Sequence, residues 1–318
     1  MVKYNLKTSE VAAIEIHNIS KTFKVGKEVI TAVDDISFDV KKGELFGLIG
    51  PDGAGKSTLI RILTTLLLPG KGSAKVDGFD VVKDYKSIRE RVGYMPGKFS
   101  LYPEMTVEET LHFFATLFKT TVSENYTLVK DIYSQLEPFK NRRAGQLSGG
   151  MKQKLALSCV LIHKPVVLFL DEPTTGVDAV SRKEFWEMLR TLKEQEISIL
   201  VSTPYMDEAS LCDRVALIQN GKTLSIGTPQ KIREDFTQVI LATKTANMMA
   251  LLHDLASFPE VDHAYTFGEF HHAIMKEEFH EDHLRQFLEE KGHNSIFIKE
   301  VAPSIEDCFM QLMQVKDE

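Results

Sequence analysis

The segment from Gly50 to Thr58 constrains the fold of this chain more than any other part. It reads Gly-Pro-Asp-Gly-Ala-Gly-Lys-Ser-Thr and matches the pattern G-x-x-x-x-G-K-[ST]. The apolar run Glu44–Ile49 precedes it, and apolar residues at helical spacing follow it as far as Pro69. A glycine-rich loop between a buried strand and a helix start is a site for phosphate groups. The sequence therefore predicts an α/β domain that binds a nucleotide.

Each residue type in this loop has a chemical role. Gly53 and Gly55 let the backbone curl so that its N–H groups point at phosphate oxygens. Lys56 brings positive charge to the β- and γ-phosphates, Ser57 offers a hydroxyl to Mg²⁺, and Thr58 can bond the α-phosphate. We therefore predict ATP and Mg²⁺ as ligands. The residues predicted to bind ATP are Gly50, Pro51, Asp52, Gly53, Ala54, Gly55, Lys56, Ser57 and Thr58.

A second apolar run leads into two acidic residues. Val166–Leu170 is typical of a buried strand, and Asp171 and Glu172 follow it directly. We expect Asp171 to hold Mg²⁺ together with Ser57, and Glu172 to polarise the attacking water as the catalytic residue. On its own this acidic pair is also typical of a helix start, and its pairing with the phosphate loop favours the catalytic interpretation.

Composition and charge argue against other classes of protein. The chain of 318 residues is 43% hydrophobic, and no apolar run approaches the ~18 residues that span a bilayer. Its net charge of -7 has the wrong sign for binding nucleic acid through phosphates, so we expect no nucleic-acid partner. Its three cysteines are far apart, which favours a reducing compartment over disulfides or a cysteine zinc site.

The patterning divides the chain into a leader and two domains. Residues 1–12 form a polar leader, and residues 13–235 form the large domain. A helix over Arg182–Gln195 lies between the apolar strand described above and another at Ile197–Ser202, which makes a βαβ unit and predicts a parallel sheet. Residues 236–318 are predicted to form a small α/β domain that begins strand, helix, strand, helix.

The segment from Leu147 to Met151 reads Leu-Ser-Gly-Gly-Met and begins a predicted helix, which is another anion site. A second anion site is unexpected in a chain that has one phosphate loop. It is explained if the second site faces the nucleotide bound by another subunit. At this point the chain resembles the ATP-binding subunits of ABC transporters over nearly all of residues 13–235. Leu147–Met151 is similar to their signature motif, Gly50–Ser57 to their Walker A motif and Val167–Asp171 to their Walker B motif.

The resemblance implies a P-loop NTPase with a RecA-like parallel-sheet core, an antiparallel β subdomain and an inserted helical subdomain at about 97–163. In this family two nucleotide domains dock head to tail, and each signature motif closes over the other domain's ATP. Phe23 matches an aromatic residue that stacks on adenine, although a phenylalanine before a turn is also typical of the core. The residues implied to act on the partner's ATP are Leu147, Ser148, Gly149, Gly150, Met151 and Asp178, the last at the D-loop position.

Val92–Pro96 and Tyr205–Ala209 are similar to the branch of the family that exports drugs, lipids or polysaccharides. In that branch the permease is a separate integral membrane subunit. The resemblance therefore implies a cytoplasmic ATPase, peripheral on the inner face of the cell membrane, that powers an exporter. In the family, a groove near residues 98–118 receives a permease helix. We expect Phe99 and Tyr102 to contact it, and most other aromatic side chains there to pack in the core.

Two positions depart from the family's pattern. Where the family has a glutamine that contacts Mg²⁺ and the attacking water, this chain has Gly97. Where the family has a histidine that bonds the γ-phosphate, it has Pro204, which lacks both a side-chain donor and a backbone N–H. These losses predict a site that binds ATP but hydrolyses it slowly. We favour an asymmetric heterodimer with a second, different nucleotide-binding chain.

Other arrangements stay open from the sequence alone. A fully active homodimer is the main alternative, because Glu172 is present. A soluble ABC ATPase and a non-enzymatic regulatory subunit are two more. Seven of the ten histidines lie beyond position 250, including His280 and His283, but the acidic residues around this pair favour a solvated helix face over a metal site.

Overall fold

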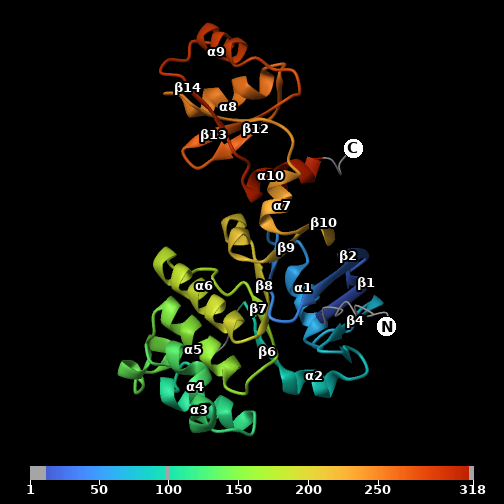
Figure 1. Ribbon diagram of the computed structural model, residues 1–318, viewed down its shortest axis with the longest axis vertical. Coiled ribbons are helices and arrows are strands. Elements are labelled where there is room, and N and C mark those ends of the chain that lie inside the picture. The colour runs from blue at the N-terminus through green and yellow to red at the C-terminus, as the bar shows by residue number, and fades with distance from the viewer. Residues whose placement is uncertain (1–11, 98–100, 315–318) are drawn as a thin grey trace, which may run out of the picture. The chain divides into compact units, whose positions relative to one another are not determined.

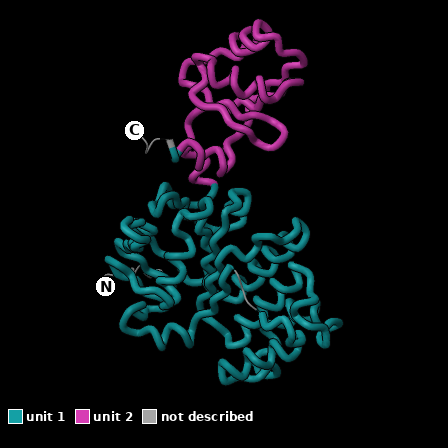
Figure 2. The backbone as a smooth tube through the Cα atoms, turned by 180° about the vertical axis from the view of Figure 1, so that it is seen from behind, with its two compact units in different colours: residues 1–229, 312–318 teal, residues 230–311 magenta. Residues whose placement is uncertain are grey.

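The computed structural model describes residues 12–97 and 101–314 (Figure 1). The chain divides into two compact units (Figure 2): unit 1 is 1–229 with 312–318, and unit 2 is 230–311. All but the last residue of the predicted leader lies outside the described residues, as does Phe99. Within the described part of the chain, no helix combines the length and the apolar character needed to cross a bilayer.

One sheet of unit 1 is antiparallel, with the strand order β2-β1-β4-β5. Its strands are β1 (Ala12–Val25), β2 (Glu28–Lys41), β4 (Lys71–Val76) and β5 (Phe79–Asp80). Along β2 the buried residues Ile36, Phe38 and Val40 alternate with exposed ones, so one face of this sheet is apolar. That face packs into the core of the unit.

The second sheet of unit 1 has the order β10-β9-β3-β8-β7-β6. Its strands are β3 (Leu45–Ile49), β6 (Val92–Met95), β7 (Val167–Asp171), β8 (Ser198–Thr203), β9 (Arg214–Gln219) and β10 (Lys222–Gly227). Pairing is parallel from β6 through β9, and β10 adds an antiparallel edge. Every residue of β3, β7 and β8 is buried, which explains their continuous apolar sequences. The predicted parallel core is confirmed.

The described helices of unit 1 begin with α1, which follows the phosphate loop. Their bounds are α1 (Lys56–Leu63), α2 (Tyr85–Arg91), α3 (Val107–Leu117), α4 (Val122–Tyr133), α5 (Gly149–Leu161) and α6 (Ala179–Glu194), with short 3₁₀ turns at Glu137–Phe139, Ala144–Gln146 and Met206–Leu211. Figure 1 shows α3, α4 and α5 grouped as a helical subdomain. α3 and α4 each begin with a capping box, led by Thr106 and Thr121.

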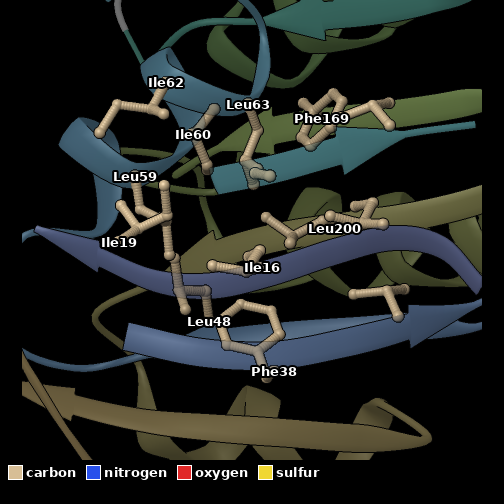
Figure 3. Packing of buried hydrophobic residues seen from close by; sticks show 14 of the residues in the cluster. Ile16, Ile19, Phe38, Leu48, Leu59, Ile60, Ile62, Leu63, Phe169 and Leu200 are labelled. Atoms are coloured by element: carbon tan, nitrogen blue, oxygen red, sulfur yellow. The ribbon is translucent and has the colours of Figure 1, made fainter. Parts of the chain in front are cut away.

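The core of unit 1 anchors α1 against both sheets (Figure 3). Leu59 and Ile60 of α1 are fully buried, in one cluster with Ile16 of β1, Leu48 of β3 and Phe169 of β7. Burying each such side chain contributes about 1.5–3 kcal/mol. Because α1 starts at the phosphate loop, this packing fixes the position of that loop relative to the strands.

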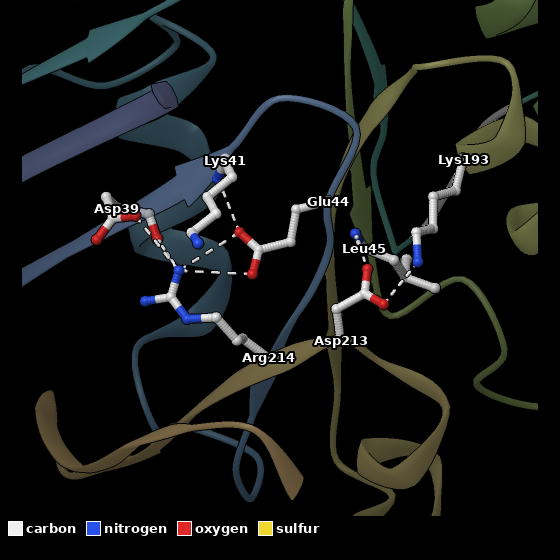
Figure 4. Close-up of polar contacts among 7 residues, drawn as sticks. All are labelled: Asp39, Lys41, Glu44, Leu45, Lys193, Asp213 and Arg214. Atoms are coloured by element: carbon white, nitrogen blue, oxygen red, sulfur yellow. Dashed lines mark hydrogen bonds and ion pairs between the residues drawn. The ribbon is translucent and has the colours of Figure 1, made fainter. Parts of the chain in front are cut away.

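Polar contacts fix the start of β3, the strand that leads into the loop (Figure 4). Arg214 of β9 lies 3.5 Å from a carboxylate oxygen of Glu44. Burial raises the pKa of Glu44, and the hydrogen bond from a backbone N–H and the charge of Arg214 oppose that rise. Asp213 accepts hydrogen bonds from the backbone N–H of Leu45 at 2.9 Å and from Lys193 Nζ of α6 at 2.6 Å.

Unit 2 has its own antiparallel sheet, of order β12-β13-β11-β14, and its own apolar core. Its elements, with the helices at its two ends, are α7 (Pro229–Glu234), β11 (Ile240–Lys244), α8 (Met248–Ser257), β12 (Val261–Phe267), β13 (Phe270–Met275), α9 (Glu281–Glu290), β14 (Phe297–Val301) and α10 (Ile305–Gln314). The expected order of strand, helix, strand, helix was wrong after the second strand. A hairpin closed at Gly268 pairs β12 with β13 before α9 begins.

Candidate nucleotide-binding site

Four parallel strands of unit 1 end at one edge of their sheet, and each leads to a predicted site residue. β3 is followed by Gly50, β8 by Pro204, and β6, one residue later, by Gly97. β7 ends in Asp171, which pairs in register with Ser202 of β8. The carboxyl edge of a parallel sheet is where open α/β folds bind ligands. The structure thus brings the Walker A loop, the Walker B acids and both departures to one edge.

The phosphate loop has the curled backbone that its glycines predict. Gly53 and Gly55 have φ values of 79° and 102°, in the region that favours glycine. A Cβ atom at Gly55 would lie 2.2 Å from the carbonyl oxygen of Ala32, and one at Gly50 would lie 2.1 Å from that of Ile218. These close approaches leave room only for glycine. The cradle at the start of α1 therefore fits phosphate groups.

Lys56 is buried, with 3% of its surface exposed, and its ammonium group is held over the loop. Nζ donates hydrogen bonds to the carbonyl oxygens of Gly50 at 2.8 Å and Pro51 at 2.9 Å. It also lies 3.1 Å from Oε1 of Glu172. An ammonium has three N–H bonds, so the one directed at Glu172 is the one that a phosphate oxygen would take. The arrangement places the positive charge of Lys56 beside the carboxylate that is predicted to be catalytic.

Asp171 gathers oxygen donors at the start of α1. Oδ1 accepts hydrogen bonds from Ser57 Oγ and from Ser202 Oγ, each at 2.8 Å. Mg²⁺ prefers oxygen ligands and is bound by one or two carboxylates together with substrate phosphates. Ser57 and Asp171 therefore fit Mg²⁺, and they meet as the sequence predicted. Ser202 was missed, although its place at the end of an apolar strand was visible in the sequence.

Glu172 is held in an uncommon backbone conformation. Its φ is 52°, in the left-handed region, which costs about 1–3 kcal/mol for a residue other than glycine. Its N–H donates to the carbonyl oxygen of Ser202 at 3.1 Å and to Ser202 Oγ at 3.0 Å, and these contacts hold the turn. Strained residues of this kind cluster at functional sites. Ser202 therefore positions both acids.

The two departures lie beside these acids. A Cβ atom at Gly97 would lie 3.0 Å from the carbonyl oxygen of Asp171 and 3.9 Å from Cβ of Glu172. Position 97 therefore adjoins both Walker B residues but brings no side chain to them. Pro204 directly follows β8, whose last residue, Thr203, pairs with the end of β3. Neither residue supplies a side-chain donor or acceptor.

The signature motif forms the N-terminus of α5. Ser148 is the N-cap, and its Oγ accepts a hydrogen bond from the N–H of Met151 at 3.3 Å. A Cβ atom at Gly150 would lie 2.4 Å from Oγ of Ser181, so α5 approaches α6 closely there. Asp178 caps α6, and its hydrogen bond from the Ser181 N–H lowers the pKa of its carboxyl. In Figure 1, α5 and α1 lie to either side of β6, β7 and β8.

Phe23 on β1, Tyr102 before α3 and Phe113 within α3 are exposed and do not pack in the core. Phe23 lies on β1 with 38% of its surface exposed, so its ring can stack on a base. Tyr102 and Phe113 are 55% and 39% exposed, with ring centroids 5.5 Å apart. The expectation that most aromatic side chains near α3 pack in the core was wrong, because Phe113 is exposed and Phe114 and Phe118 are only half-buried. The aromatic side chains of α3 have the spacing of a buried helix face, but in the structure that face is partly exposed to solvent.

Comparisons with known proteins agree with the fold. Residues 33–175 match the family model described as ABC transporter. The chain is 38% identical over 307 residues to the probable multidrug ABC transporter ATP-binding protein YbhF of Escherichia coli, covering 95% of this chain and 52% of YbhF. It is 39% identical over 227 residues to the Nod factor export ATP-binding protein I of Burkholderia lata, covering 70% of this chain and 73% of that protein.

A solved structure shows the same fold. The ATP-binding cassette MJ0796, a dimer in a post-hydrolysis state with ADP and Pi, superposes with a TM-score of 0.62 at 25% identity, over 68% of this chain and 98% of the cassette. The chain thus belongs to the family of ABC transporter ATP-binding proteins. This membership confirms the resemblance and the P-loop fold. The chain spans about half the length of YbhF.

Proposed function

We propose that this chain is an ATPase subunit of an ABC exporter whose own site binds Mg-ATP firmly and hydrolyses it slowly. The observation that carries the proposal is the contrast at one sheet edge. Lys56, Ser57 and Asp171 are assembled there, whereas Gly97 and Pro204 bring no polar side chain to it. Binding and hydrolysis are therefore separated in one site.

The residues present account for the binding half. Lys56 and the loop N–H groups hold phosphate oxygens, Ser57 and Asp171 hold Mg²⁺, and Phe23 stacks on the base. Bound Mg²⁺ neutralises charge on the phosphates. For hydrolysis, Glu172 is the one residue expected to orient water. Removing one preorganised donor from a transition state lowers kcat by about 10²–10³, so the absence of two makes this site slow.

The signature motif supports the asymmetric arrangement. Ser148 caps α5, and Asp178 caps α6. In the proposed arrangement, these residues and the glycines after Ser148 would contact ATP bound by another subunit. A heterodimer with a different nucleotide-binding chain would give this motif a competent site to complete. The exposed pair Tyr102 and Phe113 supports a contact with a separate permease, and the relatives named for multidrug transport and Nod factor export support the exporter branch. The chain would then lie on the cytoplasmic face of the membrane.

The test uses the purified chain alone. We expect saturable Mg-ATP binding with turnover well below about 1 s⁻¹, the lower end of the usual enzyme range. Glu172→Gln should leave ATP binding unchanged. Turnover at ordinary rates that Glu172→Gln abolishes would instead indicate a fully active homodimer. Isolation from native membranes should yield a polytopic membrane protein and a second nucleotide-binding chain, and recovery of neither would contradict the exporter assignment.

A further inference from the structure

Three side chains that are common metal ligands meet at the start of α9 in unit 2. Glu260 directly precedes β12, His280 directly precedes α9, and His283 lies in the first turn of that helix. One ligand atom from each lies within 4.8 Å of the other two. Within residues 12–97 and 101–314, no other group of three histidine, cysteine or acidic residues meets this spacing.

Hydrogen bonds hold the three residues in place. Glu260 Oε2 accepts from the backbone N–H of His280 at 2.7 Å, and Oε1 lies 2.9 Å from Nδ1 of His283. The carbonyl oxygen of Glu260 accepts from the N–H of Lys276 at 3.0 Å. The two imidazole rings have centroids 4.6 Å apart. The fold thus already brings Glu260 to the two histidines, which lie 20 and 23 positions further along the chain, so little further ordering is needed for a ligand to bind.

We propose that Glu260, His280 and His283 bind one divalent transition-metal ion of the zinc class. Two imidazoles and one carboxylate are a ligand set that zinc uses, with a further position open to water. Bonds of about 2.0–2.1 Å in a tetrahedron place ligand atoms about 3.3 Å apart. The three ligand atoms lie within 4.8 Å of one another, so metal binding would require them to move closer together.

The exposure of His280 and His283 distinguishes them from three buried histidines of the unit. His271, His272 and His293 are buried, and each contacts a backbone oxygen or an aspartate at 2.7–2.9 Å, so they have structural roles. His280 and His283 are exposed instead. Glu260 accepts a hydrogen bond from the backbone N–H of His280, the N-cap of α9, and its other oxygen contacts the ring of His283. The backbone contact alone does not require an imidazole at either position, and metal binding would give both rings a role.

Zinc titration of the full-length chain, without a histidine tag, tests the proposal. The protein is stripped of metal and titrated calorimetrically in excess Mg²⁺, which occupies the oxygen ligands near Asp171. We expect one saturable zinc site per chain. His280→Ala with His283→Ala should weaken its affinity at least about tenfold. His253→Ala, which removes an exposed histidine of α8, should leave the affinity unchanged.

A second measurement guards against loss of folding in the variants. Zinc should raise the thermal unfolding midpoint of the wild-type chain, because an ion bound only by the folded state stabilises it. The double variant should keep its circular dichroism spectrum and lose that rise. Glu260→Gln keeps an acceptor for the His280 N–H but should still weaken zinc binding. Unchanged affinity in Glu260→Gln or in the double variant, or no saturable site in the wild-type chain, would overturn the proposal.

Discussion

At the scale of single residues, the proposed function assigns binding of the nucleotide and its cleavage to different groups. Lys56 is fixed by two backbone carbonyl oxygens and is buried, so its charge does not depend on residues 97 or 204. Glu172 is fixed by Ser202. Positions 97 and 204, where β6 and β8 end, bring no polar side chain toward Glu172. Under the proposed function this deficit is local, so a substitution should repair it.

Pro204→His should raise the ATP turnover of the isolated chain at least about tenfold, since one preorganised donor is worth about 10²–10³ in kcat. The affinity for ATP should stay within a factor of about two, because Lys56 and the loop are untouched. Phosphate release and equilibrium binding of a fluorescent ATP analogue measure the two effects. Pro204→Ala is the matched control, because it restores the backbone N–H without a side-chain donor and should leave turnover low. Equal rates in both variants would show that the histidine is not what limits this site.

Ser202→Ala should weaken the Mg²⁺ dependence of ATP binding. Ser202 Oγ donates to Asp171 and accepts from the Glu172 N–H, and loss of such a supporting contact typically costs about 10–100-fold in metal affinity or activity. The measurement is the Mg²⁺ concentration for half-maximal binding of an ATP analogue. Ser198→Ala is the control, because Ser198 is also buried on β8 but bonds Gly43 at the other end of the strand. If both variants shift the Mg²⁺ midpoint equally, Ser202 has no special role.

The residues of the site were predictable to different degrees. The pairing of Ser57 with Asp171 follows from motifs whose spacing and flanking runs are visible along the chain. The role of Ser202 depends on the register Asp171↔Ser202 between two strands, which no local pattern specifies. Likewise, Glu260 lies 20 residues before His280, and only the fold of unit 2 joins them.

At the scale of elements, two helix N-termini meet where the signature motif lies. α5 begins after Ser148 and α6 after Asp178, and both residues cap their helices through side-chain oxygens. Gly150 allows the close approach of α5 to α6, because Oγ and Cβ of Ser181 fill the space that a side chain would need. Packing between these helices thus fixes where the motif points.

Gly150→Ala should destabilise the chain by about 1–3 kcal/mol, the usual cost of overpacking a tight contact. The added Cβ would lie 2.7 Å from Cβ of Ser181, which cannot rotate away. Gly149→Ala is the matched control: its nearest neighbour beyond its own segment would be at 3.8 Å, so the substitution should be neutral or stabilise by up to about 1 kcal/mol. Urea unfolding measures both. Equal stability of the two variants would contradict a tight α5–α6 contact.

The elements themselves were predicted best where the pattern was long or fully apolar. The buried strands β3, β7 and β8 correspond to continuous apolar runs. The helical stretch after Val107 is divided in the structure by a second capping box at Thr121, a signal that was present in the sequence. In unit 2 the strand β13 begins with Phe270 and two histidines, so polar residues interrupt the apolar pattern although all but Phe270 are buried. Their burial depends on partners such as Asp307, far along the chain.

At the scale of the whole chain, the two halves of a nucleotide site face different ways. The phosphate loop lies at the start of α1 and the signature motif at the start of α5, to either side of the strands β6–β8 (Figure 1). In the head-to-tail arrangement that we propose, one chain would carry one half of each of two sites. The solved relative MJ0796 is a dimer. Two chains that are defective in different halves should therefore complement each other when they are mixed.

Lys56→Ala removes the phosphate contact of a chain's own loop, and Ser148→Arg blocks the signature that it offers to a partner. Self-pairing of this chain serves here as a stand-in for pairing with its proposed partner, a different nucleotide-binding chain. In a Glu172→Gln background, which slows hydrolysis, we expect ATP to drive dimers of the parent chain but of neither variant alone. An equal mixture should recover dimers, because the intact loop of the Ser148→Arg chain meets the intact signature of the Lys56→Ala chain. Sedimentation velocity with and without ATP measures this. Failure of the mixture, with each variant folded, would show that the chains do not share sites head to tail.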